Sequence, residues 1–330
     1  MSQFKGKSII IAAPNHYGLL QRFKENLKAL GFTVIVIPDD IKVNIGLKNN
    51  LIHIYKKFFS RNSTFKKEKK IELRTSKQIK ILELQSIEQF DYALFIRPDL
   101  FSDNLIQYVK DKTFSTAAYQ WDGMDRFPAA YKKINLFDRF FIFDKTDHKK
   151  NEKLIPITNF YFDDILARGN VMDAYFLGTY MESRIDIIVR LSKKLKNIGL
   201  KISVNLIVKS PKKLRNIDLG IINIINKPIS FEENIVNSSK SRIILDFVND
   251  VHHGISMRTF ESIGFKKKLI TDNLLVKDYD FYNPNNIFVI ENNNFEGIEA
   301  FIKMPYENLS EEIYNKYSFK SWIKHVLNIT

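Results

Sequence analysis

Short apolar runs alternate with helical patterns along the first half of the chain. Residues 8–14 form an apolar run that ends at Pro14, which is typical of a buried strand. Apolar residues then recur at the spacing of one helix face until Gly31, and a second apolar run occupies residues 32–37. Strand, helix and strand in this order predict a parallel pair. Further strands are predicted at residues 91–96, 115–119 and 139–143.

The same alternation starts again near residue 170. A strand is predicted at residues 173–180 with a glycine turn at its end, and the helix that follows has an apolar face through Ile188 and Leu191. Further strands are predicted at residues 201–208, 242–247, 268–271 and 286–290. The repeated pattern predicts an α/β protein with two Rossmann-like domains that face a cleft.

The length of 330 residues also favours two domains. We place the first domain at residues 1–165 and the second at residues 170–305, with a linker at about 150–170. Residues 306–330 are expected to be helical, and several of them are aromatic.

One amphipathic segment does not fit this alternation. Its large apolar residues share one helix face, and basic residues lie on or beside the opposite face, a pattern typical of a helix on a membrane surface. A helix that buries its stripe in the domain core is the alternative, and the sequence alone slightly favours it. The apolar residues are Leu51, Ile52, Ile54, Tyr55, Phe58 and Phe59, and the basic ones are Lys56, Lys57 and Arg61.

The net charge of +14 is concentrated around this segment. Residues 56–80 carry ten basic side chains and two acidic ones, a net charge of +8. Such a patch attracts a phosphate-bearing glycolipid, an anionic membrane or nucleic acid, although a solvated basic loop fits the sequence equally well. The candidate membrane or acceptor patch comprises Tyr55, Lys56, Lys57, Phe58, Lys66 and Lys67.

The composition excludes several kinds of site and bears on where the protein is located. The chain has no cysteine, which excludes disulfides, thiolate metal sites and a cysteine nucleophile. Its first residues do not form a signal peptide, and no window reaches the ~20 apolar residues of a membrane-spanning helix. We therefore expect a cytoplasmic protein, which would be peripheral on the inner face of the cytoplasmic membrane if the patch binds lipid.

Two segments of the second half are suited to binding a nucleotide. The helix predicted after Gly254 and Ser256 would present free amide groups and a hydroxyl to a diphosphate, and Glu261, one turn further on, could bind a ribose. Arg258 lies on the same helix face as Glu261, so a surface ion pair is the alternative interpretation. Phe260, Ile263 and Phe265 are predicted to be buried. Gly178 and Thr179 end the first strand of this half, where ligands bind in parallel sheets.

These segments resemble the donor-binding region of GT-B glycosyltransferases, in particular the bacterial enzymes that build lipopolysaccharide core and capsule. Residues 178–184 resemble the start of the donor domain, and residues 119–127 resemble the first domain more loosely. The resemblance implies that Glu261 binds the donor ribose, that Arg258 lies near the phosphates, and that the last helix packs back on the first domain. It implies a hexosyltransferase that moves a sugar from a nucleotide sugar to a hydroxyl of a glycolipid or oligosaccharide acceptor in lipopolysaccharide, capsule or a related surface glycan.

Two residues of the first half are candidates for the general base. His16 follows the first strand, where several inverting GT-B enzymes have a basic residue, and a histidine can take up a proton near neutral pH. Asp122, in the loop after Trp121, is the competing candidate. The structural alternatives are a helix-capping or hydrogen-bonded polar residue for His16 and a turn-forming side chain for Asp122.

We expect neither a metal ion nor another cofactor. Residues 278–280 match the Asp-x-Asp signature of metal-dependent transferases, but they lie late in the chain in a polar turn. His252 and His253 are adjacent, and adjacent residues rarely converge on one ion. Two other functions fit the sequence: a nucleic-acid-binding protein that uses residues 56–80, and a non-catalytic GT-B-like partner subunit. Because the charge is confined to one segment and no nucleic-acid motif is present, we expect no nucleic acid partner.

Overall fold

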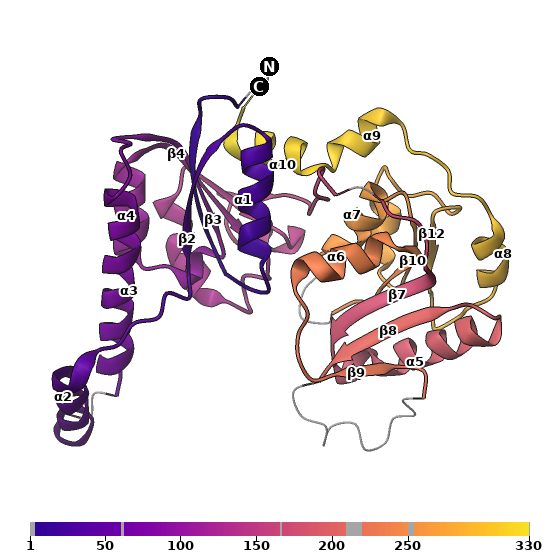
Figure 1. Ribbon diagram of the computed structural model, residues 1–330, viewed down its shortest axis with the longest axis horizontal. Helices are drawn as coiled ribbons and strands as arrows, with labels where there is room; N and C mark the ends of the chain where they lie inside the picture. Colours follow the sequence, from indigo (N-terminus) through magenta and orange to yellow (C-terminus); the bar gives the residue numbers. More distant parts are fainter. Residues whose placement is uncertain (1–3, 61–62, 166, 209–219, 250–253, 330) are drawn as a thin grey trace. The chain divides into compact units, whose positions relative to one another are not determined.

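The computed structural model describes residues 4–60, 63–165, 167–208, 220–249 and 254–329. The chain divides into two compact units, Met1–Pro156 and Ile157–Thr330. Each unit contains a six-stranded sheet in which all neighbouring strands are parallel (Figure 1). The predicted α/β fold with two Rossmann-like domains is confirmed.

The sheet of the first unit has the strand order β2-β1-β3-β4-β5-β6. Five of these strands were predicted, and the sixth is a three-residue edge strand without an apolar run of its own. The strands are β1 (Ser8–Ala13), β2 (Thr33–Pro38), β3 (Phe90–Ile96), β4 (Thr113–Gln120), β5 (Arg139–Ile142) and β6 (Leu154–Pro156).

Helix α1 of the first unit (Leu19–Ala29) forms where the helical spacing predicts it. It buries Leu20, Phe23 and Leu27, and the chain then reverses at Gly31, whose φ of 104° favours glycine. The other helices are α2 (Gly46–Phe59), α3 (Phe65–Glu83), α4 (Asp103–Asp111) and the 3₁₀ helices η1 (Pro98–Leu100), η2 (Pro128–Leu136) and η3 (Lys145–Lys150).

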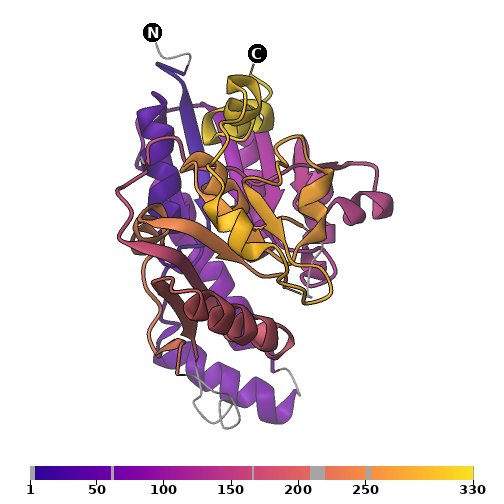
Figure 2. The same cartoon turned by 90° about the vertical axis from the view of Figure 1, so that its right-hand side faces the viewer.

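The prediction that the stripe of residues 51–59 is buried in the core is wrong. Helix α2 contains no buried residue, and Leu51 and Phe58 are 68% and 73% exposed. Figures 1 and 2 show the reason: α2 lies beside the end of α3 that is remote from the sheet, so the core cannot cover it. The sequence periodicity defines the face of the helix but not what that face contacts.

The sheet of the second unit has the strand order β12-β11-β10-β7-β8-β9. The short edge strand β9 was not predicted, and the other five were. The strands are β7 (Met172–Thr179), β8 (Ile202–Ile207), β9 (Asn223–Ile225), β10 (Ser241–Asp246), β11 (Lys268–Thr271) and β12 (Ile287–Val289).

Helices α5 (Glu182–Asn197), α6 (Phe231–Ser239) and α7 (Met257–Gly264) of the second unit pack against this sheet. Helix α5 buries Ile188 and Leu191 in the core, as predicted. Helix α7 buries Phe260 and Ile263, which confirms the prediction that this helix is fixed beside the sheet. The others are η5 (Leu274–Asp278), α8 (Ile298–Lys303), α9 (Glu311–Lys316) and α10 (Phe319–Leu327).

The helical tail predicted after residue 305 is present as α9 and α10. The indole Nε1 of Trp322 donates to the carbonyl of Thr158 at 3.0 Å, and the Trp322 and Phe160 rings are 4.6 Å apart. The backbone amide of Lys320 donates to the Asp163 carboxylate at 2.8 Å. These contacts join α10 to the first residues of the second unit. The packing of this helix on the first domain stays a prediction.

Candidate functional site

The predicted donor residues gather at the point where the sheet of the second unit reverses its strand order. From β7 the chain adds β8 and β9 on one side and then returns to place β10 on the other side of β7. Open parallel sheets bind ligands at the carboxyl ends of the strands beside such a reversal. Thr179 lies at the end of β7, and the segment from Gly254 to Glu261 lies between β10 and β11.

Arg258 bridges the two strands at this point. Its Nη2 donates to the carbonyl of Leu177 in β7 at 2.6 Å, and its Nη1 contacts the carboxylate of Asp246 at the end of β10 at 3.3 Å. The Asp246 side chain is buried, whereas the Arg258 side chain is 26% exposed. The interpretation of Arg258 and Glu261 as a surface ion pair is therefore wrong, because Asp246 is the ion-pair partner and Glu261 is buried.

A second arginine, which the sequence reasoning missed, ties the same strand ends together. Arg184 donates to the carbonyl of Thr179 at 2.7 Å and to the carbonyl of Phe247 at 3.4 Å. It stands at the start of α5, within the segment whose resemblance to a donor domain was noted, and that was its only signal in the sequence.

Gly178 makes room for this arginine. A Cβ atom on Gly178 would lie 2.7 Å from Cζ of Phe176 and 2.9 Å from Nη2 of Arg184, distances that real side chains do not tolerate. The glycine turn predicted here does not form, because β7 continues through Thr179. Gly178 is thus required by packing, and Thr179 is exposed just beyond it.

The start of α7 is capped and held in place. The Oγ of Ser256 accepts a hydrogen bond from the amide of Arg258 at 3.2 Å, which is the usual role of a serine at this position. The carbonyl of Gly254 accepts from the side chain of Asn273, and that of Ile255 accepts from Asn159, both at 3.0 Å. The Ser256 hydroxyl can still donate its proton outward, and the helix end carries partial positive charge.

Glu261 is the most unusual group at this site. Its side chain is 4% exposed, and its Oε2 has no hydrogen-bond partner among the described residues. The pKa of Glu261 is raised to about 7, chiefly by burial; Arg258 and Ser238 act in the opposite direction, and the charge of Asp246 adds to the effect of burial. Buried carboxylate oxygens are almost always hydrogen-bonded, so the lack of a partner for this oxygen suggests that a ligand supplies the hydrogen-bond donor.

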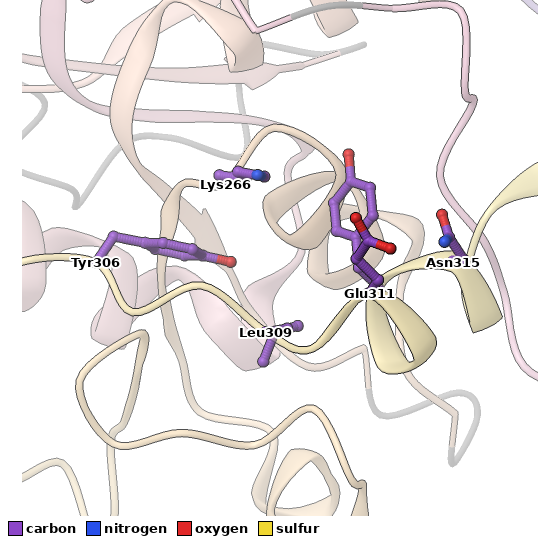
Figure 3. A pocket seen from close by; sticks show the side chains of 6 residues that line it. Lys266, Tyr306, Leu309, Glu311 and Asn315 are labelled. Atoms are coloured by element: carbon purple, nitrogen blue, oxygen red, sulfur yellow. The ribbon is translucent and has the colours of Figure 1, made fainter.

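Two hollows of the second unit differ in where they lie relative to the predicted site residues. An open hollow of about 520 Å³ is lined by residues 180–183, directly after the exposed Thr179. A smaller one of about 250 Å³ lies beyond the other end of α7, where Lys266, Tyr306 and Tyr314 contribute to its wall (Figure 3). The first adjoins the carboxyl end of β7, where a ligand is expected, and the second adjoins none of the predicted site residues.

In the first unit, His16 lies in the exposed loop between β1 and α1. Tyr17 and Gly18 adopt positive φ angles of 52° and 86°, and the amide of Asn15 donates to the Asp39 carboxylate at 3.0 Å. No side chain caps α1, so the helix-cap interpretation of His16 is wrong. The strand order also reverses between β1 and β3, which places His16 at the corresponding point of this sheet.

Asp122 belongs to an ion-pair cluster that the sequence did not reveal. One of its oxygens accepts from Arg97 at 2.8 Å and the other contacts Arg126 at 3.4 Å. Arg97 also forms two hydrogen bonds of 2.8 Å with Asp99 and lies 3.6 Å from the centre of the Phe127 ring. Burial alone would lower the pKa of Arg97, but the two carboxylates outweigh burial and raise it.

The membrane or acceptor patch is divided between two helices. Tyr55, Lys57 and Phe58 are exposed on α2, and the ammonium of Lys56 lies 4.5 Å from the centre of the Phe65 ring. Lys66 and Lys67 are exposed in the first turn of α3. Arg61 lies outside the described residues. Of the helices that the structure describes, none is long and apolar enough to cross a bilayer.

The described ranges contain no group of three or more His, Cys, Asp or Glu residues arranged to hold a metal ion. His252 and His253 lie outside them. Asp280 accepts hydrogen bonds from Lys316 and from the hydroxyl of Tyr317, both at 2.5 Å, which gives this residue of the Asp-x-Asp match a structural role. The expectation that the protein uses no metal and no cofactor stays a prediction.

Comparison with known proteins places the fold. No family model matches the chain, and no curated protein is similar to it in sequence. An α-glucosyltransferase solved with UDP and a 13-mer DNA containing a HMU base aligns with 98% of this chain and 100% of its own, at a TM-score of 0.59 and 12% identity. A trehalose-phosphate synthase from Burkholderia xenovorans aligns with 98% of this chain and 99% of its own, at a TM-score of 0.56 and 10% identity. A glycosyltransferase from Rickettsia africae aligns with 98% of this chain and 100% of its own, at a TM-score of 0.51 and 15% identity. The architecture is that of GT-B glycosyltransferases.

Proposed function

We propose that the protein is a glycosyltransferase that moves a sugar, a hexose in our proposal, from a nucleotide donor to a hydroxyl of lipopolysaccharide, capsule or a related surface glycan. The observation that carries the proposal is the presence on α7, at the strand-order reversal of the second sheet, of Arg258, which pairs with Asp246, and of Glu261, whose Oε2 has no hydrogen-bond partner among the described residues. Structures with this fold have been solved with UDP, so we propose a UDP-sugar as the donor.

The donor diphosphate would bind at the start of α7. The helix amides and the Ser256 hydroxyl can donate to phosphate oxygens. A guanidinium has five N–H donors, and Arg258 uses only part of them for Leu177 and Asp246. Arg258 can therefore neutralise the charge that develops on the leaving nucleoside diphosphate, and we propose that transfer needs no metal ion.

The donor ribose would bind Glu261. An ionised carboxylate accepts hydrogen bonds only, and the two ribose hydroxyls are donors that match Oε2. Hydrogen bonds to the ionised form favour it, so donor binding should lower the pKa of Glu261 from about 7. The carboxylate is desolvated before the donor arrives, which makes the new hydrogen bonds stronger than those it would make in water.

We assign the general base to His16 in preference to Asp122. Both oxygens of Asp122 are engaged by guanidinium groups, so protonation would disrupt two ion pairs. The His16 imidazole is exposed in the loop after β1 and has space to approach an acceptor hydroxyl. Asp122 is then a residue that positions Arg97.

A thermal-shift panel of UDP-, GDP-, CMP- and ADP-sugars tests the proposed function. One donor class is expected to raise the free energy of unfolding by about 2.7 kcal/mol at a hundredfold excess over its Kd. The wild-type protein with free monosaccharides serves as the control. No shift with any nucleotide sugar would contradict the proposal and would favour a non-catalytic GT-B-like subunit.

The choice of base has its own test, made with the donor that the panel identifies. His16→Asn is expected to lower kcat for sugar transfer by about 10²-fold or more while leaving the donor-induced thermal shift intact. Asp122→Asn is expected to lower the thermal stability of the protein, because it removes one ionic partner of Arg97. A variant Asp122→Asn that folds normally but loses transfer, beside an active His16→Asn, would reverse the assignment.

A further inference from the structure

We propose that α2 lies flat on an anionic membrane surface and inserts one apolar face into the boundary between headgroups and acyl chains. This inference is independent of the proposed transfer reaction, because no group of the donor site takes part in it. The face, here named the α2 stripe, has side chains that are between 52% and 86% exposed. It consists of Leu47, Leu51, Ile54, Tyr55, Phe58 and Phe59.

The α2 stripe is continuous along the helix. Each member lies three or four residues from another member, so they share one side of α2 over almost its whole length. The rings of Tyr55 and Phe59 stack at 4.9 Å. Among the other residues that the structure describes, large exposed apolar side chains such as Phe114 do not form such a row. A row of this kind marks a surface that binds another apolar phase, because single exposed residues are ordinary and contiguous ones are not.

Positive charge borders the α2 stripe on both sides. Helical geometry places Lys56 about 60° beyond one edge of the stripe and Lys57 about 60° beyond the other, and Lys57 is exposed. Helix α2 contains no acidic residue. At the start of α3, the acidic Glu68 accepts a hydrogen bond from Thr64, and its neighbours in sequence include the exposed Lys66, Lys67 and Lys70. Lysines at the edge of an apolar face extend their ammonium groups toward lipid phosphates.

This combination favours a membrane over two other partners. A second copy of the chain packed through the α2 stripe would bring the lysines of both copies together, and like charges oppose such a contact. Nucleic acid would attract the lysines and could stack on Tyr55 or Phe58, but it would leave Leu47, Leu51 and Ile54 without an apolar partner. An anionic lipid surface matches the charge and the apolar area together.

Flotation with lipid vesicles tests the inference on the full-length protein. The wild type is expected to bind vesicles of phosphatidylcholine and phosphatidylglycerol and to bind pure phosphatidylcholine much more weakly. The double variant Leu51→Ser, Phe58→Ser is expected to bind the anionic vesicles at least about tenfold more weakly. Neutralising Lys57 and Lys67 to glutamine should weaken binding about fivefold per residue and remove part of the salt dependence.

The structure offers matched controls. Phe114→Ser removes an equally exposed aromatic ring outside the α2 stripe, and Lys196→Gln removes an exposed charge from α5; both should leave vesicle binding unchanged. Since α2 buries no residue, the stripe variants should keep the wild-type Tm.

Three results would overturn the inference. One is equal binding of the wild type and the stripe variant to anionic vesicles. Another is a concentration-dependent dimer that the stripe variant dissolves, without vesicle binding. The third is oligonucleotide binding that the lysine variant loses, again without vesicle binding.

Discussion

Replacing Glu261 with glutamine is expected to stabilise the folded protein above neutral pH and to weaken donor binding. In the folded state the pKa of Glu261 is raised from 4.5 to about 7, chiefly by burial. Between these values the folded state holds a proton that the unfolded chain has released, so the free energy of unfolding falls as the pH rises through this window. Above the pKa of the folded state, the ionised buried carboxylate lowers the free energy of unfolding by the full penalty, on the order of 3 kcal/mol.

Glutamine has nearly the same shape and does not ionise, so the penalty should disappear in the variant. Urea unfolding at about pH 8 is expected to show Glu261→Gln more stable than the wild type by up to about 3 kcal/mol, and the difference should vanish at about pH 4. Glu296→Gln, at an exposed carboxylate of the same unit, should show no such pH dependence. A Glu261→Gln variant that is less stable than the wild type at the higher pH would contradict this account of the buried carboxyl.

Arg258→Met is expected to cost both stability and donor binding. Its guanidinium compensates the buried carboxylate of Asp246, and removing one partner of a buried ion pair costs about 3–5 kcal/mol. The same change removes the cation proposed to neutralise the donor diphosphate, so no donor-induced thermal shift should remain. Arg242→Met is the matched control, because its ion pair with Asp173 is partly exposed and should be worth about 1 kcal/mol or less.

A double variant separates the two roles of Arg258. In Arg258→Met, Asp246→Leu no buried charge is left uncompensated, so much of the lost stability should return. Donor binding should stay absent, because the cation is still missing. Recovery of donor binding together with stability would show that Arg258 acts only through the fold and does not contact the phosphates.

The sequence predicted the strands well where a strand carries its own signal. The runs that became β1, β3, β10 and β11 are apolar because both faces of a parallel sheet are covered, and breakers or helical patterns bound them. The edge strands β6 and β9 are three residues long and too short to show a period. They form because a neighbouring strand is present, which is information that no local window contains.

The candidate site was predictable to the extent that its residues lie close together in the chain. The stretch from Gly254 to Glu261 supplied a capped helix start and a carboxylate in one short segment. Asp246 and Leu177, the partners of Arg258, are 12 and 81 residues away from it and carry no motif. The side chain of Asp122 similarly depends on Arg97, 25 residues earlier. The periodicity of α2 identified its apolar face, but only the fold shows that this face meets solvent.

The most direct test of the donor site is a calorimetric titration that removes the ribose hydroxyls. UDP and its 2′,3′-dideoxy analogue are titrated into the wild type and into Glu261→Gln. A hydrogen bond to a charged group is worth about 1.5–3 kcal/mol, so the wild type should prefer UDP by about tenfold to a hundredfold. In Glu261→Gln we expect this preference to fall to a few-fold. An equal preference for UDP in both proteins would show that Glu261 does not bind the ribose and would contradict the donor site proposed for the second unit.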